Sequence, residues 1–125
     1  MAYTDMRQFV AKLDAAGELV QIDAEVDPVE ELGAICREML DQGGPAILFT
    51  NIKGYNHRLL ANMMGTTKRA AMVLECAEDE LIETYGELSA RTPVEELPLT
   101  AGGPCKEVHV GEADLDLDDL VPQIL

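Results

Sequence analysis

The sequence predicts an α/β fold, a layered domain in which a small mixed sheet is flanked by helices. Apolar residues recur at three- and four-residue spacing in several segments, which is typical of amphipathic helices. Two short apolar runs between these segments have the length of buried strands. Glycine and proline punctuate the boundaries between segments, as expected where helices and strands alternate in one layered domain.

The first two elements are a helix and a strand. Thr4 or Asp5 can cap a helix that ends at Gly17, because short polar side chains favour N-caps and glycine favours C-caps. The expected buried face of this helix consists of four apolar residues, Met6, Phe9, Val10 and Leu13. Residues 19–26 then alternate loosely between apolar and polar, which predicts a strand with one or two solvated positions.

The segment from Glu25 to Gly54 holds the clearest helix and strand signals. Asp27 is the expected N-cap, with Pro28 in the first turn and Glu30 at capping-box spacing. An apolar stripe follows, made of Leu32, Ile35, Cys36, Met39 and Leu40. Gly43-Gly44-Pro45 ends the helix, and the uncharged run at 46–49 is expected to lie near the centre of the sheet.

The rest of the chain continues the pattern. Residues 58–62 predict a second inner strand, and Thr66 or Thr67 can cap a helix that runs from there. Residues 78–90 predict a more acidic helix whose expected inward face is Leu81, Ile82, Tyr85 and Leu88. A proline- and glycine-rich connector at 92–104 and a last strand at 106–110 complete the expected elements.

Composition and charge narrow the classes of function. The chain has 125 residues, enough for one domain with its own core, and a net charge of −15. Such a surface repels phosphate backbones and anionic lipid, so nucleic acid and membranes are poor partners. Three cysteines without a CxxC motif suggest reduced thiols in a cytoplasmic protein. The first residues lack the apolar core of a signal peptide, and no stretch has the length of a membrane span.

Two patterns suggest metal sites, and neither is complete. The acidic run at 112–119 has a calcium-loop spacing, but Asp119 stands where an EF-hand requires glycine and Leu125 where it requires glutamate. Cys105 and His109 share a strand face, yet a zinc site needs at least one more ligand. A solvated acidic turn and buried thiols are therefore the preferred interpretations. No serine, cysteine or histidine arrangement supports nucleophilic catalysis.

A cluster of hydroxyls and cations follows Gly65. Thr66, Thr67, Lys68 and Arg69 bring two hydroxyls and two positive charges to the expected N-terminus of a helix, where free N–H groups favour anions. The cluster lacks the spacing of a P-loop. It is the candidate site for an anion or for contact with another domain, and ordinary helix capping beside two solvated bases is the alternative.

Several blocks taken together resemble the N-terminal region of the UbiD-like decarboxylase family. Their order and spacing match that family over nearly the whole chain. The blocks are MRQF at 6–9, GELV at 17–20, EVDP at 25–28, ELGAI at 31–35, GPAILF at 44–49, NIKG at 51–54, Asn62 with GT at 65–66 and KR at 68–69, GPC at 103–105, and DLDL at 114–117. The ELGAI block is similar to ferulic-acid-type decarboxylases, whereas GPC is closer to ubiquinone-pathway enzymes, so the subfamily stays open.

The resemblance implies a single domain over residues 1–125, with the family's flavin-binding and C-terminal domains outside this chain. Family members are lyases that (de)carboxylate aromatic or unsaturated acids and use prenylated FMN with a divalent metal and potassium. No position here matches the family's metal-ligating or catalytic motifs, so no catalytic, cofactor-binding or metal residue carries over to this chain.

The expected role is therefore that of an N-terminal domain or fragment of such a decarboxylase, inactive alone and packed against the flavin domain of the same or a separate chain. The full enzyme is expected to be a homo-oligomer. The alternative is a free-standing acidic subunit that docks on a separate catalytic chain. The resemblance implies a carboxy-lyase for the full enzyme, whereas this chain lacks the catalytic motifs of that family.

Overall fold

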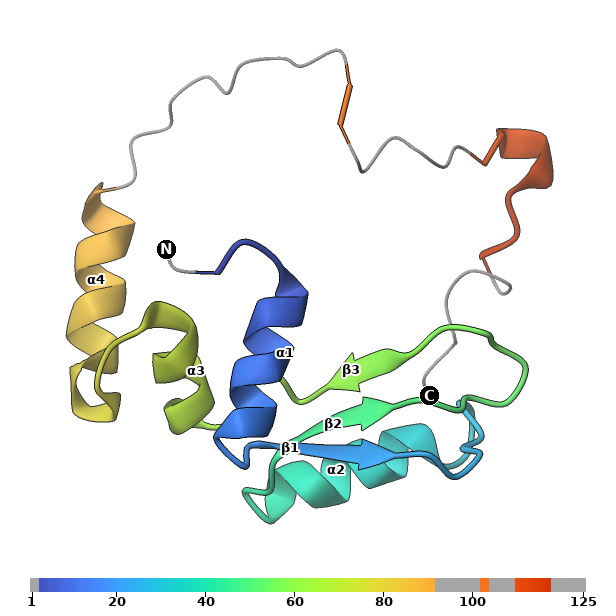
Figure 1. Cartoon of the computed structure of the whole chain (residues 1–125), viewed down its shortest axis with the longest axis horizontal. Coiled ribbons are helices and arrows are strands. Elements are labelled where there is room, and N and C mark those ends of the chain that lie inside the picture. Colours follow the sequence, from blue (N-terminus) through green and yellow to red (C-terminus); the bar gives the residue numbers. More distant parts are fainter. Residues whose placement is uncertain (1–2, 92–101, 104–109, 118–125) are drawn as a thin grey trace.

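A computed structural model describes residues 3–91, 102–103 and 110–117 of the chain, and Figure 1 shows its arrangement. The described elements are α1 (Met6–Ala15), β1 (Leu19–Ile22), α2 (Leu32–Asp41), β2 (Ala46–Phe49), β3 (Leu59–Ala61), α3 (Thr67–Leu74), the 3-10 turn η1 (Glu78–Glu80), α4 (Leu81–Arg91) and the 3-10 turn η3 (Glu112–Asp114). The expected connector at 92–104 and strand at 106–110 fall largely outside the described residues.

The three strands form one mixed sheet in the order β1-β2-β3. Strand β2 pairs with β1 in parallel, with Val20 opposite Ile47, and with β3 antiparallel, with Leu48 opposite Leu60. The prediction of an α/β domain with a small mixed sheet is confirmed, and β2 is central as expected. The expectation that 58–62 forms an inner strand is wrong, because β3 lies at the edge of the described sheet.

Helices cover the two faces of this sheet, with α2 on one side and α1 on the other (Figure 1). Ile47 and Phe49 point toward α2 and join Leu32 in the larger core cluster. Ala46 points the opposite way, toward a second cluster that contains Phe9 and Leu13 of α1. This alternation follows from the period-two geometry of a strand that is buried on both faces.

Helix α1 begins and ends where the sequence predicts. The Asp5 carboxylate accepts a hydrogen bond from the Gln8 N–H at 3.0 Å and caps the first turn. Gly17 follows the helix with a φ of +70°, a conformation that other residues adopt only at a cost. Between these ends, Phe9 and Leu13 are buried, while Met6 at the N-terminal end remains largely exposed.

Helix α2 begins four residues later than predicted. Asp27 does accept from the N–H of Val29, and the Glu31 carboxylate, rather than that of Glu30, accepts from the Asp27 N–H at 2.9 Å. These contacts hold residues 27–31 in a turn, and the helix proper begins at Leu32. The prediction of Asp27 as the N-cap with Glu30 at the capping-box position is therefore wrong, because the Asp27 and Glu31 carboxylates stabilise a turn that leads into the helix.

Strand β1 is shorter than the alternating run that predicted it. It ends at Ile22. Further along, Val26 forms an isolated β-bridge with Ile52, and the Val26 N–H donates a hydrogen bond to the Asn51 carbonyl at 3.1 Å. Both Val26 and Ile52 are nearly fully buried. The loop after β2 therefore closes one end of the core.

Helices α3 and α4 form a pair beside the sheet (Figure 1). Thr66 caps α3 as predicted, with its hydroxyl accepting from the Arg69 N–H. The expected inward face of α4 is largely exposed: the residue exposures are 86% for Ile82, 65% for Tyr85 and 45% for Leu88. Helix α4 contacts α3 and η1 and has few other neighbours among the described elements, so much of its apolar stripe stays open.

Candidate functional site

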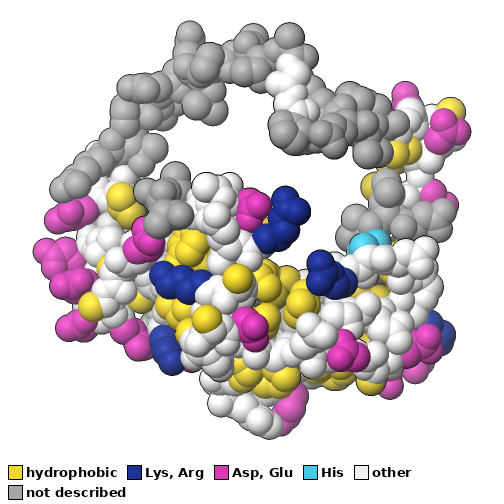
Figure 2. Space-filling view, viewed as in Figure 1, with side chains coloured by type: hydrophobic (Ala, Val, Ile, Leu, Met, Phe, Trp, Pro, Cys, Tyr) yellow, Lys and Arg dark blue, Asp and Glu magenta, His cyan; other side chains and the backbone are white. Residues whose placement is uncertain are grey.

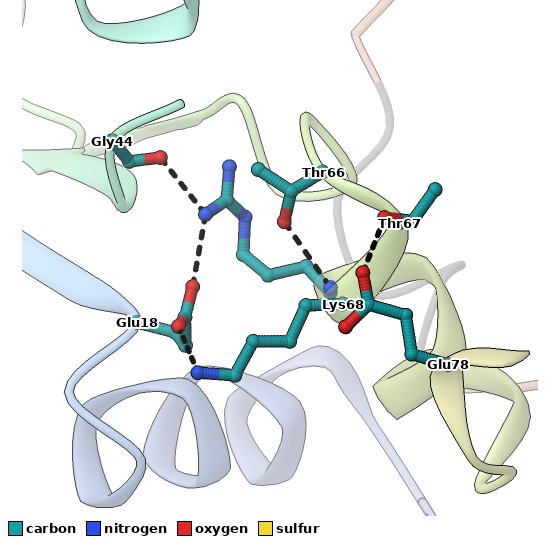
Figure 3. Close-up of polar contacts among 7 residues, drawn as sticks. Glu18, Gly44, Thr66, Thr67, Lys68 and Glu78 are labelled. Atoms are coloured by element: carbon teal, nitrogen blue, oxygen red, sulfur yellow. Dashed lines mark hydrogen bonds and ion pairs between the residues drawn. The ribbon is translucent and has the colours of Figure 1, made fainter. Parts of the chain in front are cut away.

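The candidate site is built on the first turn of α3, where the sequence placed its cluster of hydroxyls and cations (Figure 3). Thr66 has extended backbone angles and caps the helix, so its hydroxyl is already engaged. The Thr67 hydroxyl donates to a carboxylate oxygen of Glu78 at 2.5 Å. Both hydroxyls of the predicted cluster therefore have partners within the chain.

Arg69 points into the protein and is fully buried. Its Nη1 donates to the Glu18 carboxylate at 3.0 Å and to the Gly44 carbonyl at 2.9 Å (Figure 3). These two bonds join α3 to the residue that precedes β1 and to the turn that precedes β2. The side chain acts as a brace between three segments that lie far apart in the sequence.

The remaining guanidinium nitrogens of Arg69 are less well satisfied. Nε and Nη2 are buried and have no hydrogen-bond partner among the described residues. A buried donor without an acceptor loses its hydration and gains nothing in return. The brace is therefore under-satisfied on one side, and its stability depends heavily on the Glu18 carboxylate.

Lys68 approaches the same carboxylate from the solvent side. Its Nζ lies 2.5 Å from Glu18 Oε1, and its side chain is 56% exposed, compared with 16% for Glu18. The hydrogen bond from Lys68, with that from Arg69, lowers the pKa of the Glu18 carboxyl below its ordinary value, while partial burial opposes the shift. The carboxylate therefore keeps its charge to a lower pH than an ordinary glutamate does.

Gly65 leaves room for this arrangement. A Cβ at that position would lie 2.7 Å from Cδ1 of Leu40 and 3.0 Å from Nη2 of Arg69. Both distances are shorter than ordinary van der Waals contacts, so any side chain would push against the buried guanidinium or the α2 leucine. A side chain at this position would require the Leu40 side chain to shift.

The structure places all four predicted residues together and shows what holds each of them. Glu18, an acid of this domain, forms ion pairs with the two positive charges at the helix N-terminus. The local sequence does not reveal this partner, because Glu18 lies 50 and 51 residues away from Lys68 and Arg69 along the chain. Contact of this turn with an anion or with another domain stays a prediction.

The other candidates do not assemble a centre among the described residues. Within residues 3–91, 102–103 and 110–117, no group of three or more His, Cys, Asp or Glu side chains could hold a metal ion. Cys105 and His109 lie outside this part of the chain. Burial raises the pKa of the Cys36 thiol, which makes it less reactive. None of the helices in the described part is long and apolar enough to cross a membrane.

The decisive comparison is with known protein families. A model described as the 3-octaprenyl-4-hydroxybenzoate carboxy-lyase N-terminal domain matches residues 10–89. The chain belongs to this family. The match begins within α1 and ends within α4, so it spans the sheet and the brace. The resemblance to the N-terminal region of UbiD-like decarboxylases is thereby confirmed.

Solved structures of UbiD-class enzymes match the same region. The closed form of vanillic acid decarboxylase from Sedimentibacter hydroxybenzoicus matches 100% of this chain with a TM-score of 0.82 and 25% identity. An evolved dimeric form of HmfF from Pelotomaculum thermopropionicum matches 74% with a TM-score of 0.65 and 25% identity. The 3,4-dihydroxybenzoic acid decarboxylase of Klebsiella pneumoniae matches 68% with a TM-score of 0.60 and 31% identity.

This UbiD N-terminal domain corresponds to a small part of those enzymes, since the three matches cover 28%, 21% and 20% of their chains. The HmfF structures contain prFMN or FMN. In the present chain, the two adjacent cations at the start of α3, Lys68 and Arg69, are tied to Glu18.

Proposed function

We propose that residues 1–125 form the N-terminal domain of a UbiD-like (de)carboxylase of aromatic or unsaturated acids that works in the cytoplasm. The observation that carries this proposal is the family match over residues 10–89, together with alignment to decarboxylase chains several times longer. In such an enzyme, prenylated FMN, a divalent metal and potassium bind to a separate flavin domain. The present domain packs against that domain and helps to shape its entrance, and the full enzyme is a homo-oligomer.

The structure of this domain is consistent with a role in packing against a neighbouring domain. Its most buried polar group, Arg69, ties three segments of its own chain together. Three of its exposed large apolar residues, Ile82, Tyr85 and Leu88, lie on α4. A rigid body with an open apolar surface is suited to packing against a neighbour.

The reading frame beyond the codon for Leu125 tests this proposal. A downstream segment that encodes a flavin domain is the expected result. A stop codon directly after Leu125 would contradict it and would favour the alternative, an acidic subunit that docks on a separate catalytic chain.

A further inference from the structure

We draw no further inference here: the strongest candidate, the open hollow beside α1 on the sheet (Figure 2), which is lined by Leu48, Leu60, Arg7, Arg58 and Asp14, carries none because its basic and acidic side chains together select no one partner and nothing in the described residues shows what covers it.

Discussion

The buried brace predicts an unusual order of stability among substitutions of Glu18 and Arg69. Glu18→Gln removes the carboxylate charge but keeps Arg69 charged, fully buried and short of acceptors. Removal of one partner of a buried ion pair costs about 3–5 kcal/mol. Since the Glu18 side chain is 16% exposed and glutamine still accepts one hydrogen bond, we expect a loss of about 2–4 kcal/mol.

Arg69→Met, which nearly conserves volume, should cost less. It removes the buried charge together with the two unpartnered nitrogens and leaves Glu18 paired with Lys68. The Gly44 carbonyl and Oε2 of Glu18 lose their hydrogen bonds from the guanidinium, and we expect a loss of about 1–2 kcal/mol. The double variant should be more stable than Glu18→Gln alone, because no buried charge is then left without its counterpart.

Urea unfolding followed by circular dichroism measures these free energies. Lys68→Met serves as the control and should cost less than about 1 kcal/mol, because the lysine side chain is mostly exposed. If Arg69→Met destabilised the chain more than Glu18→Gln, the guanidinium would have to be well satisfied, and the reasoning from its unpartnered nitrogens would be refuted.

Three further predictions concern pH and packing. The pKa of Glu18 is lower in the folded chain than in the unfolded chain, so the stability that the Glu18 carboxylate contributes is present above the unfolded pKa and is lost as the pH falls through the folded pKa. Urea unfolding between about pH 3 and 6 should therefore show a weaker dependence of the unfolding free energy on pH in Glu18→Gln than in the parent chain. An unchanged pH profile would contradict this. Ile47→Ala should lower the free energy of unfolding by about 2–5 kcal/mol, whereas Leu48→Ala should lower it less, since Leu48 is only partly buried beside an open groove. Equal losses in urea unfolding would refute the assignment of Ile47 and Leu48 to a fully covered and a partly covered face of the sheet. Gly65→Ala should destabilise the folded chain by about 1–3 kcal/mol, because the new Cβ would lie too close to Leu40. A melting temperature equal to that of the parent chain would contradict this and show that α2 can shift without a loss of stability.

Local signals in the sequence predicted the elements that depend on neighbouring residues. The cap at Asp5, the turn at Gly17 and the cap at Thr66 each involve contacts within a few positions, and all three are confirmed. The uncharged strand at 46–49 was placed correctly at the centre of the sheet. These features follow from side-chain chemistry that does not require knowledge of the tertiary fold.

The errors occurred where tertiary contacts decide the outcome. Leu48 belongs to the uncharged central strand but is only partly buried, because α1 covers only part of its face of the sheet. The stripe on α4 predicts a buried helix face, and a periodic pattern cannot reveal whether the covering surface belongs to the same domain. Similarly, the partnership of Glu18 with Arg69 joins residues 51 positions apart, for which the local sequence holds no signal.

The central claim is that this UbiD N-terminal domain supports a flavin site located elsewhere. Its most direct test is the flavin content of the purified chain after incubation with excess reduced prenylated FMN, Mn²⁺ and K⁺, followed by gel filtration and assay of CO₂ release from 4-hydroxybenzoate or vanillate. We predict a spectrum without flavin absorbance and no CO₂ above the protein-free control. Retention of flavin in a one-to-one ratio with the chain, together with CO₂ release, would contradict the claim.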